Sequence, residues 1–304
     1  MFDAPAPVVG WGLYARKSVQ VNSFDRKKVA IWLFEAVKIA TERSSQQLVS
    51  GIFMIDWGVH VGGERFNILE IVSAAAALEG QIRSLGVAKI KLHDDQRSFA
   101  DAVGGSLKGF VGEHFRSSIN TLVPTRFLGF SGHDANGKTL VTAAMRCDDL
   151  GGWSLDRYVS EYWERAYRGE DGEPVALETG SLDFARDIRG NVAYIGEGYV
   201  DESCRDNNLA AYVVRLCIVL SQLKWSPDYI YGWMANKHAY RGLFLRWGYT
   251  TCYPNGMKWV NAPSNPDYGN LCFLGCDESG VAQLLRAPLA VMGETNQMSM
   301  STGT

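Results

Sequence analysis

The sequence predicts an α/β fold, because segments with strand character alternate with apolar or amphipathic helices along most of its 304 residues. The clearest antiparallel pair is a hairpin, in which residues 125–131 and 139–145 flank a turn that contains Asn136-Gly137. A second strong signal spans residues 191–235, where an apolar strand, a polar turn, a long apolar helix and another strand follow one another. We therefore expect a sheet that is covered by helices.

The composition limits the class of protein. With 46% hydrophobic residues, 21% charged residues and a net charge of −3, the chain is typical of a globular protein and shows no basic excess for nucleic acid. It contains no run of about 18 apolar residues that would cross a membrane, and it does not begin with a secretion signal. Six scattered cysteines are typical of reduced thiols. We expect a cytoplasmic protein with no nucleic-acid or membrane partner.

The first 86 residues contain no motif that indicates a function. The patterns predict a helix over residues 24–43, a strand over 47–61 and a second helix over 66–85. Residues 1–86 are therefore interpreted as an N-terminal α/β extension that could be a separate subdomain, a dimerisation element for a homodimer, or a cover over one sheet face. At the other end, residues 291–304 are small and polar and are expected to be disordered.

Coarser patterns predict the elements that follow. A strand is expected over residues 87–92 and a helix over 97–115, which three glycines weaken. After the hairpin, aromatic residues at helical spacing predict a further helix within residues 150–172. Residues 257–260 and 269–274 are expected to add closing strands. The Cys272-Cys276 spacing is only a weak zinc signal, so no metal is expected.

The polar turn before the helix at residues 209–223 is a place where a phosphate could bind. The first amides of a helix lack internal acceptors, and the helix dipole leaves partial positive charge there. An anion across the amides of residues 206–210 would accept hydrogen bonds from these amides and would balance the partial positive charge. The alternative is an ordinary connection whose amides are capped by Asn207 or Asn208 and by water.

These residues also resemble a known family. Arg205-Asp206-Asn207-Asn208-Leu209-Ala210 is similar to the Arg/Gln-x-x-Gly-x-Gly/Ala signature of the GNAT acetyltransferase superfamily, which cradles the pyrophosphate of acetyl-coenzyme A. Downstream, Asn236-Lys237-His238-Ala239 with Phe244-Leu245-Arg246-Trp247-Gly248-Tyr249 resembles the Asn-x-x-Ala and Tyr-x-x-x-Gly-Phe segment of that family. The chain departs from the family at Asn208, which replaces the middle glycine, and at Phe244, which replaces a tyrosine that often protonates the leaving thiolate.

The resemblance covers roughly residues 87–260 and implies a GNAT-like mixed, mostly antiparallel central sheet flanked by helices. It implies a domain over residues 87–290, with residues 150–172 as a helical insertion that either belongs to the core or forms a wall of the acceptor pocket. The implied activity is acyl transfer, most often of acetyl, from acyl-CoA to a primary amine of a small molecule or peptide. The implied cofactor-binding residues are Tyr199, Val200, Arg205, Asp206, Asn207, Asn208, Leu209, Ala210, Asn236 and Phe244.

Two residues are predicted to be catalytic. Glu197 is the candidate base, provided that a bulge turns it toward the face on which Tyr194 and Gly196 meet the substrate; otherwise it forms a salt bridge on the opposite face. Residues 237–247 are predicted to form one continuous helix that ends at Gly248. Tyr240 is the candidate acid, because this helix would place it one turn before Phe244. Water or another nearby side chain could also protonate the thiolate.

Other classes of protein are disfavoured by the motifs that the sequence lacks. It contains neither a Gly-x-x-x-x-Gly-Lys-Ser/Thr phosphate loop nor a Gly-x-Ser-x-Gly nucleophile motif. Two rival functions remain open within the same fold. One is a non-catalytic acyl-CoA-binding or assembly protein, and the other is a transferase of a longer acyl chain.

Overall fold

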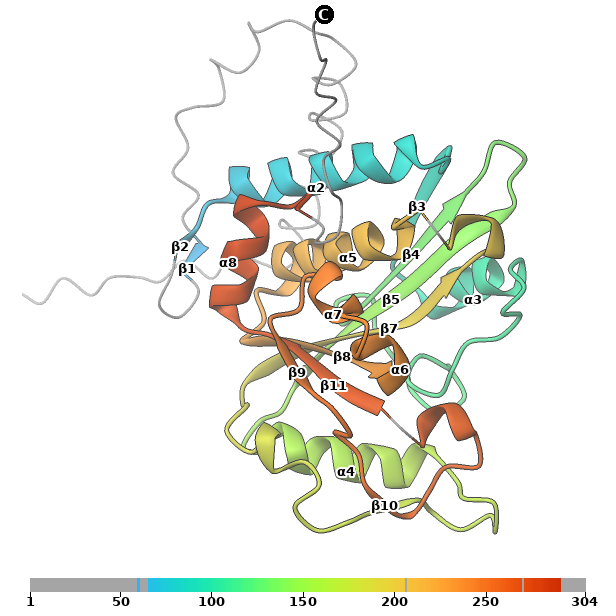
Figure 1. Cartoon of the computed structure of the whole chain (residues 1–304), viewed down its shortest axis with the longest axis vertical. Helices are drawn as coiled ribbons and strands as arrows, with labels where there is room; N and C mark the ends of the chain where they lie inside the picture. Colours follow the sequence, from blue (N-terminus) through green and yellow to red (C-terminus); the bar gives the residue numbers. More distant parts are fainter. Residues whose placement is uncertain (1–58, 61–64, 206, 270, 291–304) are drawn as a thin grey trace, which may run out of the picture.

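The fold is built around one seven-stranded sheet (Figure 1). The computed structural model describes residues 59–60, 65–205, 207–269 and 271–290. All neighbouring strands of this sheet are antiparallel except β7 and β8, which run parallel. The order across the sheet is β3 (Lys89–His93), β4 (Phe127–His133), β5 (Thr139–Asp149), β7 (Asn191–Val200), β8 (Tyr229–Ala235), β11 (Leu271–Cys276) and β9 (Thr251–Tyr253). The predicted mixed, mostly antiparallel sheet is confirmed.

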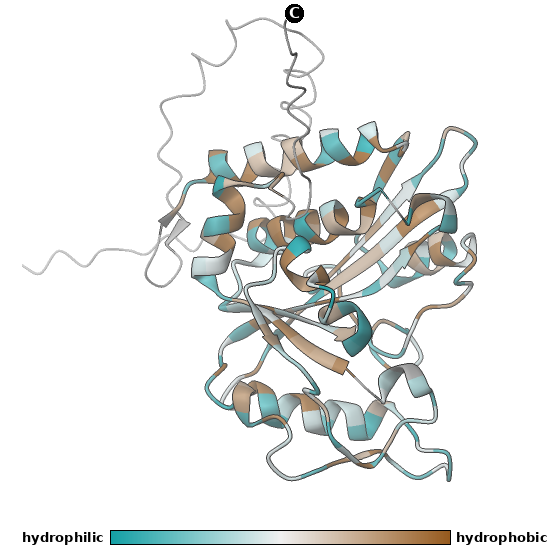
Figure 2. Cartoon of the chain, viewed as in Figure 1, coloured by the Kyte–Doolittle hydropathy of each residue, from teal (hydrophilic) through white to brown (hydrophobic). Residues whose placement is uncertain are grey.

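Helices cover both faces of the sheet and form two hydrophobic cores. One core lies under α2 (Ile68–Ser84), α5 (Leu209–Trp225) and α8 (Glu278–Arg286). The other lies under α3 (Gln96–Gly104) and α4 (Leu155–Ala166). Hydrophobic and hydrophilic residues alternate along α2 (Figure 2), which is the pattern of a helix with one face on the core.

The remaining elements are short. β1 (Val59–His60) pairs with β2 (Arg65–Phe66), and β6 (Ala176–Leu177) pairs with β10 (Trp259–Asn261). Two one-turn helices, α6 (Asn236–Ala239) and α7 (Leu243–Arg246), follow β8. Three 3-10 turns complete the described chain: η2 (Asp183–Ala185), η3 (Glu202–Cys204) and η4 (Pro266–Tyr268).

The order of elements agrees with the one that the resemblance to the GNAT superfamily implied. A strand, a helix and a hairpin come first, and β7, α5, β8, the α6–α7 segment and the closing strands β9 and β11 follow. The helical insertion forms α4 between β5 and β7. The GNAT-like fold is thereby confirmed by the topology.

Two predicted helices differ from the observed ones. The single helix expected over residues 237–247 is wrong, because Gly242 has φ +73° and separates α6 from α7. The helix expected over residues 97–115 ends at Gly104, where a glycine pair favours termination.

The predictions for the two ends of the chain are tested only in part. The helix predicted for residues 24–43, most of the strand predicted for 47–61 and the tail 291–304 lie outside the described residues. The domain boundary at residue 86 stays a prediction, although α2 packs in the same core as α5. No helix in the described part of the chain is both long and apolar enough to span a membrane.

Candidate active site

The strands β7 and β8 pair over only part of their length. Their parallel register begins at Val192 and Tyr229 and ends at Ile195 and Gly232. β7 nevertheless continues to Val200 and β8 to Ala235. We name residues 196–200 and 233–235 the strand opening. Within the described chain, no β7–β8 pairing continues beyond Ile195 and Gly232, so the main-chain groups on the two facing edges can bind an extended ligand.

A β-bulge lies at the start of this opening. The register between β5 and β7 shifts between Thr142 and Ala144, and Glu197 has φ +55°, which is uncommon for a residue other than glycine. The Thr142 hydroxyl donates a hydrogen bond to the carbonyl oxygen of Glu197 at 3.2 Å. The bulge was the condition on which Glu197 was predicted to turn toward the substrate face.

The Glu197 carboxylate is fully engaged by the segment that follows α3. Its Oε2 atom pairs with Lys108 Nζ at 2.5 Å, and its Oε1 atom accepts the N–H of Gly112 at 2.9 Å. A Cβ atom at Gly112 would lie 2.5 Å from Oε1, so the close approach requires glycine there. The bulge and the salt bridge thus occur together, and Glu197 holds this segment against β7.

The start of α5 shows how Asn208 replaces the glycine of the family signature. Asn208 is the N-cap and has φ +62°, a left-handed conformation that asparagine adopts more readily than most residues. The Leu209 N–H donates to Asn207 Oδ1 at 3.2 Å, so one of the helix amides is capped by the protein. In the described chain no acceptor contacts the N–H of Ala210. Among the described residues, self-capping therefore reaches the Leu209 amide but not the Ala210 amide.

An arginine that the sequence analysis did not select lies beside this helix end. Arg246 Nη2 donates a hydrogen bond to Asn208 Oδ1, whereas Arg246 Nε is buried without a partner. Among the described residues no carboxylate forms an ion pair with Arg246. A cation next to the positive end of a helix dipole is unfavourable, and a bound anion would reverse that cost. The Arg205 side chain is mostly exposed and lies 3.4 Å from Glu202.

The other predicted cofactor residues lie along the same opening. The Tyr199 hydroxyl donates to Asp201 Oδ2 at 3.2 Å. Asn236 accepts from Cys272 Sγ at 2.7 Å and donates to Asn255 Oδ1 at 2.5 Å, so its amide is engaged by the protein. Val200 and Phe244 pack against the core beneath α5. Asp206 lies outside the described residues.

The role of Tyr240 as the acid stays a prediction, although the helix on which it was based is interrupted. Its predicted role depended on a continuous helix from residue 237 to residue 247, which the left-handed Gly242 interrupts. The Tyr240 side chain is 66% exposed.

A small buried cavity lies under α4, with room for about one water molecule. The aromatic face of α4 packs in the core here, as Tyr162 and Trp163 show by their burial. The cavity is lined by His114, Arg146, Asp148, Tyr158, Val159, Tyr162, Trp163, Tyr194 and Tyr231. Tyr194 lies between this cavity and the strand opening. It lines the cavity, and a Cβ atom at Gly196 would lie 2.7 Å from its hydroxyl.

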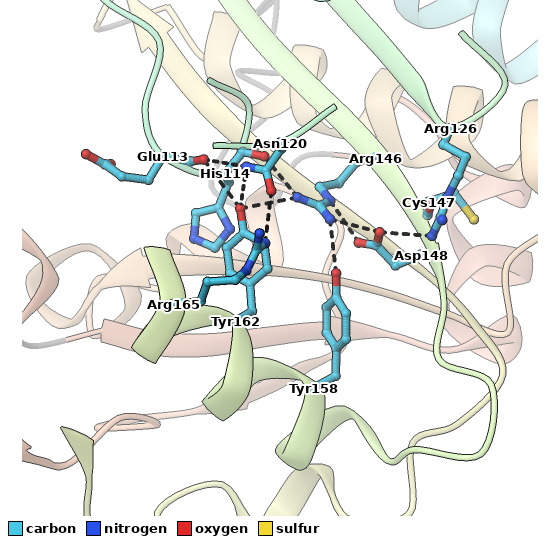
Figure 3. Close-up of polar contacts among 10 residues, drawn as sticks. All are labelled: Glu113, His114, Asn120, Arg126, Arg146, Cys147, Asp148, Tyr158, Tyr162 and Arg165. Carbon is cyan, nitrogen blue, oxygen red and sulfur yellow. Dashed lines mark hydrogen bonds and ion pairs between the residues drawn. The ribbon is translucent and has the colours of Figure 1, made fainter. Parts of the chain in front are cut away.

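A buried arginine organises the polar side of this cavity (Figure 3). Arg146 donates to both carboxylate oxygens of Asp148, at 2.8 and 2.9 Å, and to the Tyr158 hydroxyl at 3.0 Å. Its Nη1 atom donates to the main-chain oxygen of His114 at 3.0 Å. Burial alone would lower the pKa of Arg146, but the Asp148 carboxylate outweighs burial and the pKa is raised. The network therefore holds α4 and the segment around His114 on β5.

His114 and Tyr194 are both uncharged near neutral pH. The His114 ring stacks on Tyr162 with centroids 4.9 Å apart and lies 4.6 Å from the Tyr194 ring. Burial, and then the charge of Arg146, lowers the pKa of His114 well below its ordinary value. Burial, and then the charge of Glu197, raises the pKa of Tyr194 well above its ordinary value. His114 thus offers a free lone pair and Tyr194 an O–H donor.

The sequence contained a signal for one of these residues but not for the other. Counted back from Arg205, Tyr194 falls at a position that the resemblance to the GNAT superfamily implies to be substrate-facing, although it was not selected as catalytic. His114 and Lys108 come from a segment about 80 residues earlier, and only the tertiary fold brings them to β7. No group of metal-binding side chains is present among the described residues.

Comparisons with known proteins found similar folds among solved structures and nothing that shows an activity. No family model and no curated protein matches the sequence. Arabidopsis thaliana NAA60 in complex with acetyl-CoA is 10% identical, with 63% of this chain and 99% of that chain covered and a TM-score of 0.36. Agmatine N-acetyltransferase is 13% identical, with 66% and 95% covered and a TM-score of 0.36.

A third solved structure is that of FeeM, an N-acyl amino acid synthase from uncultured soil microbes. It is 12% identical, with 72% of this chain and 88% of that chain covered and a TM-score of 0.31. All three scores are low, so these likenesses carry no argument about activity.

Proposed function

We propose that this chain transfers an acyl group, most simply acetyl, from acyl-CoA to a primary amine. The observation that carries the proposal is the start of α5, where the Arg246 guanidinium lies beside the helix end and the Ala210 amide has no acceptor among the described residues. An amide at a helix N-terminus and an arginine without a carboxylate partner in the described chain are together suited to a diphosphate. The remaining residues of the signature, from Arg205 to Leu209, would surround the same group.

The strand opening supplies the rest of the binding site in this proposal. The pantetheine arm carries amide groups, which can pair with the unpaired edge of β7 along Tyr199 and Val200 as an added strand would. The thioester would then lie near Gly196, which has no side chain of its own and lies beside the Tyr194 hydroxyl. The attacking amine would approach from the α3–α4 face, on which Glu197 fixes the neighbouring segment. Phe244 and Asn236 would border the thioester end.

Calorimetry with acetyl-CoA tests the binding half of the proposal. Ala210→Glu places a carboxylate where the diphosphate would lie, so binding should be abolished, whereas Ala210→Gln adds the same bulk without charge and should retain measurable affinity. Arg246→Met should weaken binding by about ten- to a hundredfold, since a charge-assisted hydrogen bond contributes about 1.5–3 kcal/mol. Unchanged affinity in Ala210→Glu would remove the start of α5 from the argument.

Thiol release with a panel of amines tests the catalytic half. A non-catalytic acyl-CoA-binding protein remains a second candidate, because both Glu197 oxygens are engaged and the Tyr240 side chain is exposed. Binding without turnover across the panel would favour that candidate. The same assay with acyl-CoA substrates of increasing chain length would separate acetyl transfer from transfer of a longer acyl chain.

A further inference from the structure

Two polar residues, Tyr194 and His114, line the small cavity under α4. The Tyr194 hydroxyl lies beside Gly196, the first residue of the strand opening. His114 Nε2 is buried without a hydrogen-bond partner, and His114 lines the same cavity. A buried polar atom without a partner is costly, and one water in the cavity would satisfy His114 Nε2.

The proposed reaction needs a route for one proton. The attacking amine must lose a proton, and the departing thiolate must gain one, so the transfer as a whole neither consumes nor releases a proton. Glu197 is an unfavourable carrier because Lys108 and the Gly112 amide already occupy its carboxylate. Tyr240 is exposed to solvent beyond a break in its helix. Tyr194 and His114, which line the cavity, are the buried groups that could carry the proton instead.

We propose that Tyr194, one water in the cavity and His114 form a proton shuttle that serves both halves of the transfer. The shuttle rests on the proposed acyl transfer. In it, the same series of groups acts as the base toward the amine and as the acid toward the thiolate. The amine donates an N–H to the Tyr194 oxygen, the Tyr194 hydroxyl donates to the water, and the water donates to His114 Nε2. Tyr194 touches the reacting nitrogen, and His114 acts through it.

Each step is balanced. As the amine nitrogen forms its bond to the thioester carbon, its proton passes to the Tyr194 oxygen, the Tyr194 proton passes to the water, and a water proton passes to His114. As the carbon–sulfur bond breaks, its electron pair stays on sulfur. The chain then runs in reverse and delivers the proton to the thiolate. Tyr194, the water and His114 end as they began, and the products are the amide and the free thiol.

The surroundings of His114 favour the return step. Arg146 on β5, Tyr162 on α4, Tyr167 directly after α4 and Tyr194 on β7 face the imidazole, and Arg146 is the only charged group among them. Burial and this positive charge place the pKa of His114 well below 6.5, whereas an ordinary thiol has a pKa of about 8.5. Protonated His114 is therefore a short-lived carrier that gives its proton to sulfur readily.

The test uses Tyr194→Phe and His114→Gln, with Tyr231→Phe as the matched control. Tyr231 is the register partner of Tyr194 and lines the same cavity, but the groups that act on its hydroxyl are those of Tyr158 and Asp148 at the closed end. We expect kcat to fall by about 100-fold in the first two variants, as for loss of general acid–base catalysis, with acyl-CoA affinity unchanged by calorimetry. Tyr231→Phe should stay within about twofold of wild type.

Two measurements on proton transfer complete the test. The wild-type enzyme should show a solvent deuterium isotope effect on kcat with a curved proton inventory, because several protons move together, and its kcat should fall at low pH as His114 becomes protonated. His114→Gln should lose that low-pH limb. A linear inventory in the unaltered protein, or full kcat in both variants, would overturn the shuttle. Failure of the wild type to bind acyl-CoA would instead overturn the proposed function.

Discussion

Ile195 and Gly232 form the last residue pair between the parallel strands β7 and β8, and a Cβ atom at Gly232 would lie 3.0 Å from the Ile195 carbonyl oxygen. The two main chains are thus in contact immediately before they part. Tyr194 and Tyr249 place their hydroxyls close to this point, one beside Gly196 and the other beside Gly232. Small residues at the point of separation keep the backbone accessible there.

The two glycines of the β7 opening are expected to respond differently to alanine. In Gly196→Ala the new methyl group would lie 2.7 Å from the Tyr194 hydroxyl, so we expect a loss of about 1–3 kcal/mol in the free energy of unfolding, together with weaker acyl-CoA binding. Gly198→Ala meets no atom within 4 Å and is the matched control, with a change below about 0.5 kcal/mol. Urea unfolding measures both, and equal losses would contradict the expected contact.

The left-handed conformation of Asn208 predicts which residues can replace it. At φ +62°, Asn208→Gly should keep the turn and most of the acyl-CoA affinity, although it loses the contact with Arg246. Asn208→Val should lower the free energy of unfolding by about 1–2 kcal/mol, because a β-branched residue is strained in this region. Denaturant unfolding and calorimetry on the two variants check this order, and a reversed order would show that the side-chain contact matters more than the backbone.

The pair formed by Lys108 and Glu197 should be strongly coupled. Lys108→Met leaves a carboxylate that is 7% exposed with only the Gly112 amide, so we expect a loss of about 3 kcal/mol in stability. The double variant with Glu197→Gln removes the unpaired charge and should recover part of that loss. A double-mutant cycle measured by urea unfolding gives the coupling, and additive losses would mean that the two side chains do not interact in solution.

His93 predicts a pH dependence of stability between about pH 4 and 6.5. Burial lowers its pKa from 6.5 to about 4, and its two ring nitrogens lie 3.1 Å from Ser98 Oγ and 2.8 Å from Ser131 Oγ. The unfolded chain then binds a proton that the folded chain does not, so the His93 contribution is full above pH 6.5 and is lost as the pH falls toward 4. The loss should be at most about 3 kcal/mol.

Unfolding measured across this pH range in His93→Gln checks that expectation. The variant should show a shallower fall in stability than the wild type, by up to one bound proton. The other histidines with lowered pKa, which include His133 and His238, provide the remaining slope. An identical slope in both proteins would show that His93 titrates alike in the folded and unfolded chains.

Local patterns were sufficient to predict most of the sheet. The hairpin β4–β5, the apolar strand β7 and the fully buried α5 each carry a signal within about 15 residues, and each is observed close to its predicted bounds. The helix after β8 was predicted wrongly, since Gly242 takes a left-handed conformation that its neighbours do not signal. Glycine tolerates both hands of the backbone, so its presence alone did not locate the break.

The candidate site was predictable only along β7 and the turn that follows. The bulge at Glu197 was a condition of the prediction and is observed, but its partner Lys108 lies 89 residues away and no spacing rule connects them. Arg246 reaches Asn208 only because α7 folds back over the start of α5. The groups that complete the site are therefore a product of the tertiary structure.

The opening between β7 and β8 is made largely by main-chain atoms, and this affects which residues around it can be substituted. A ligand that is bound by peptide groups requires a particular backbone conformation and a few small residues. Most neighbouring side chains can then be substituted. To build the same ligand-binding opening into another sheet, a designer would need Gly196 and Gly198, the bulge at Glu197 and the left-handed Asn208 in the same geometry. The other residues around the opening could differ.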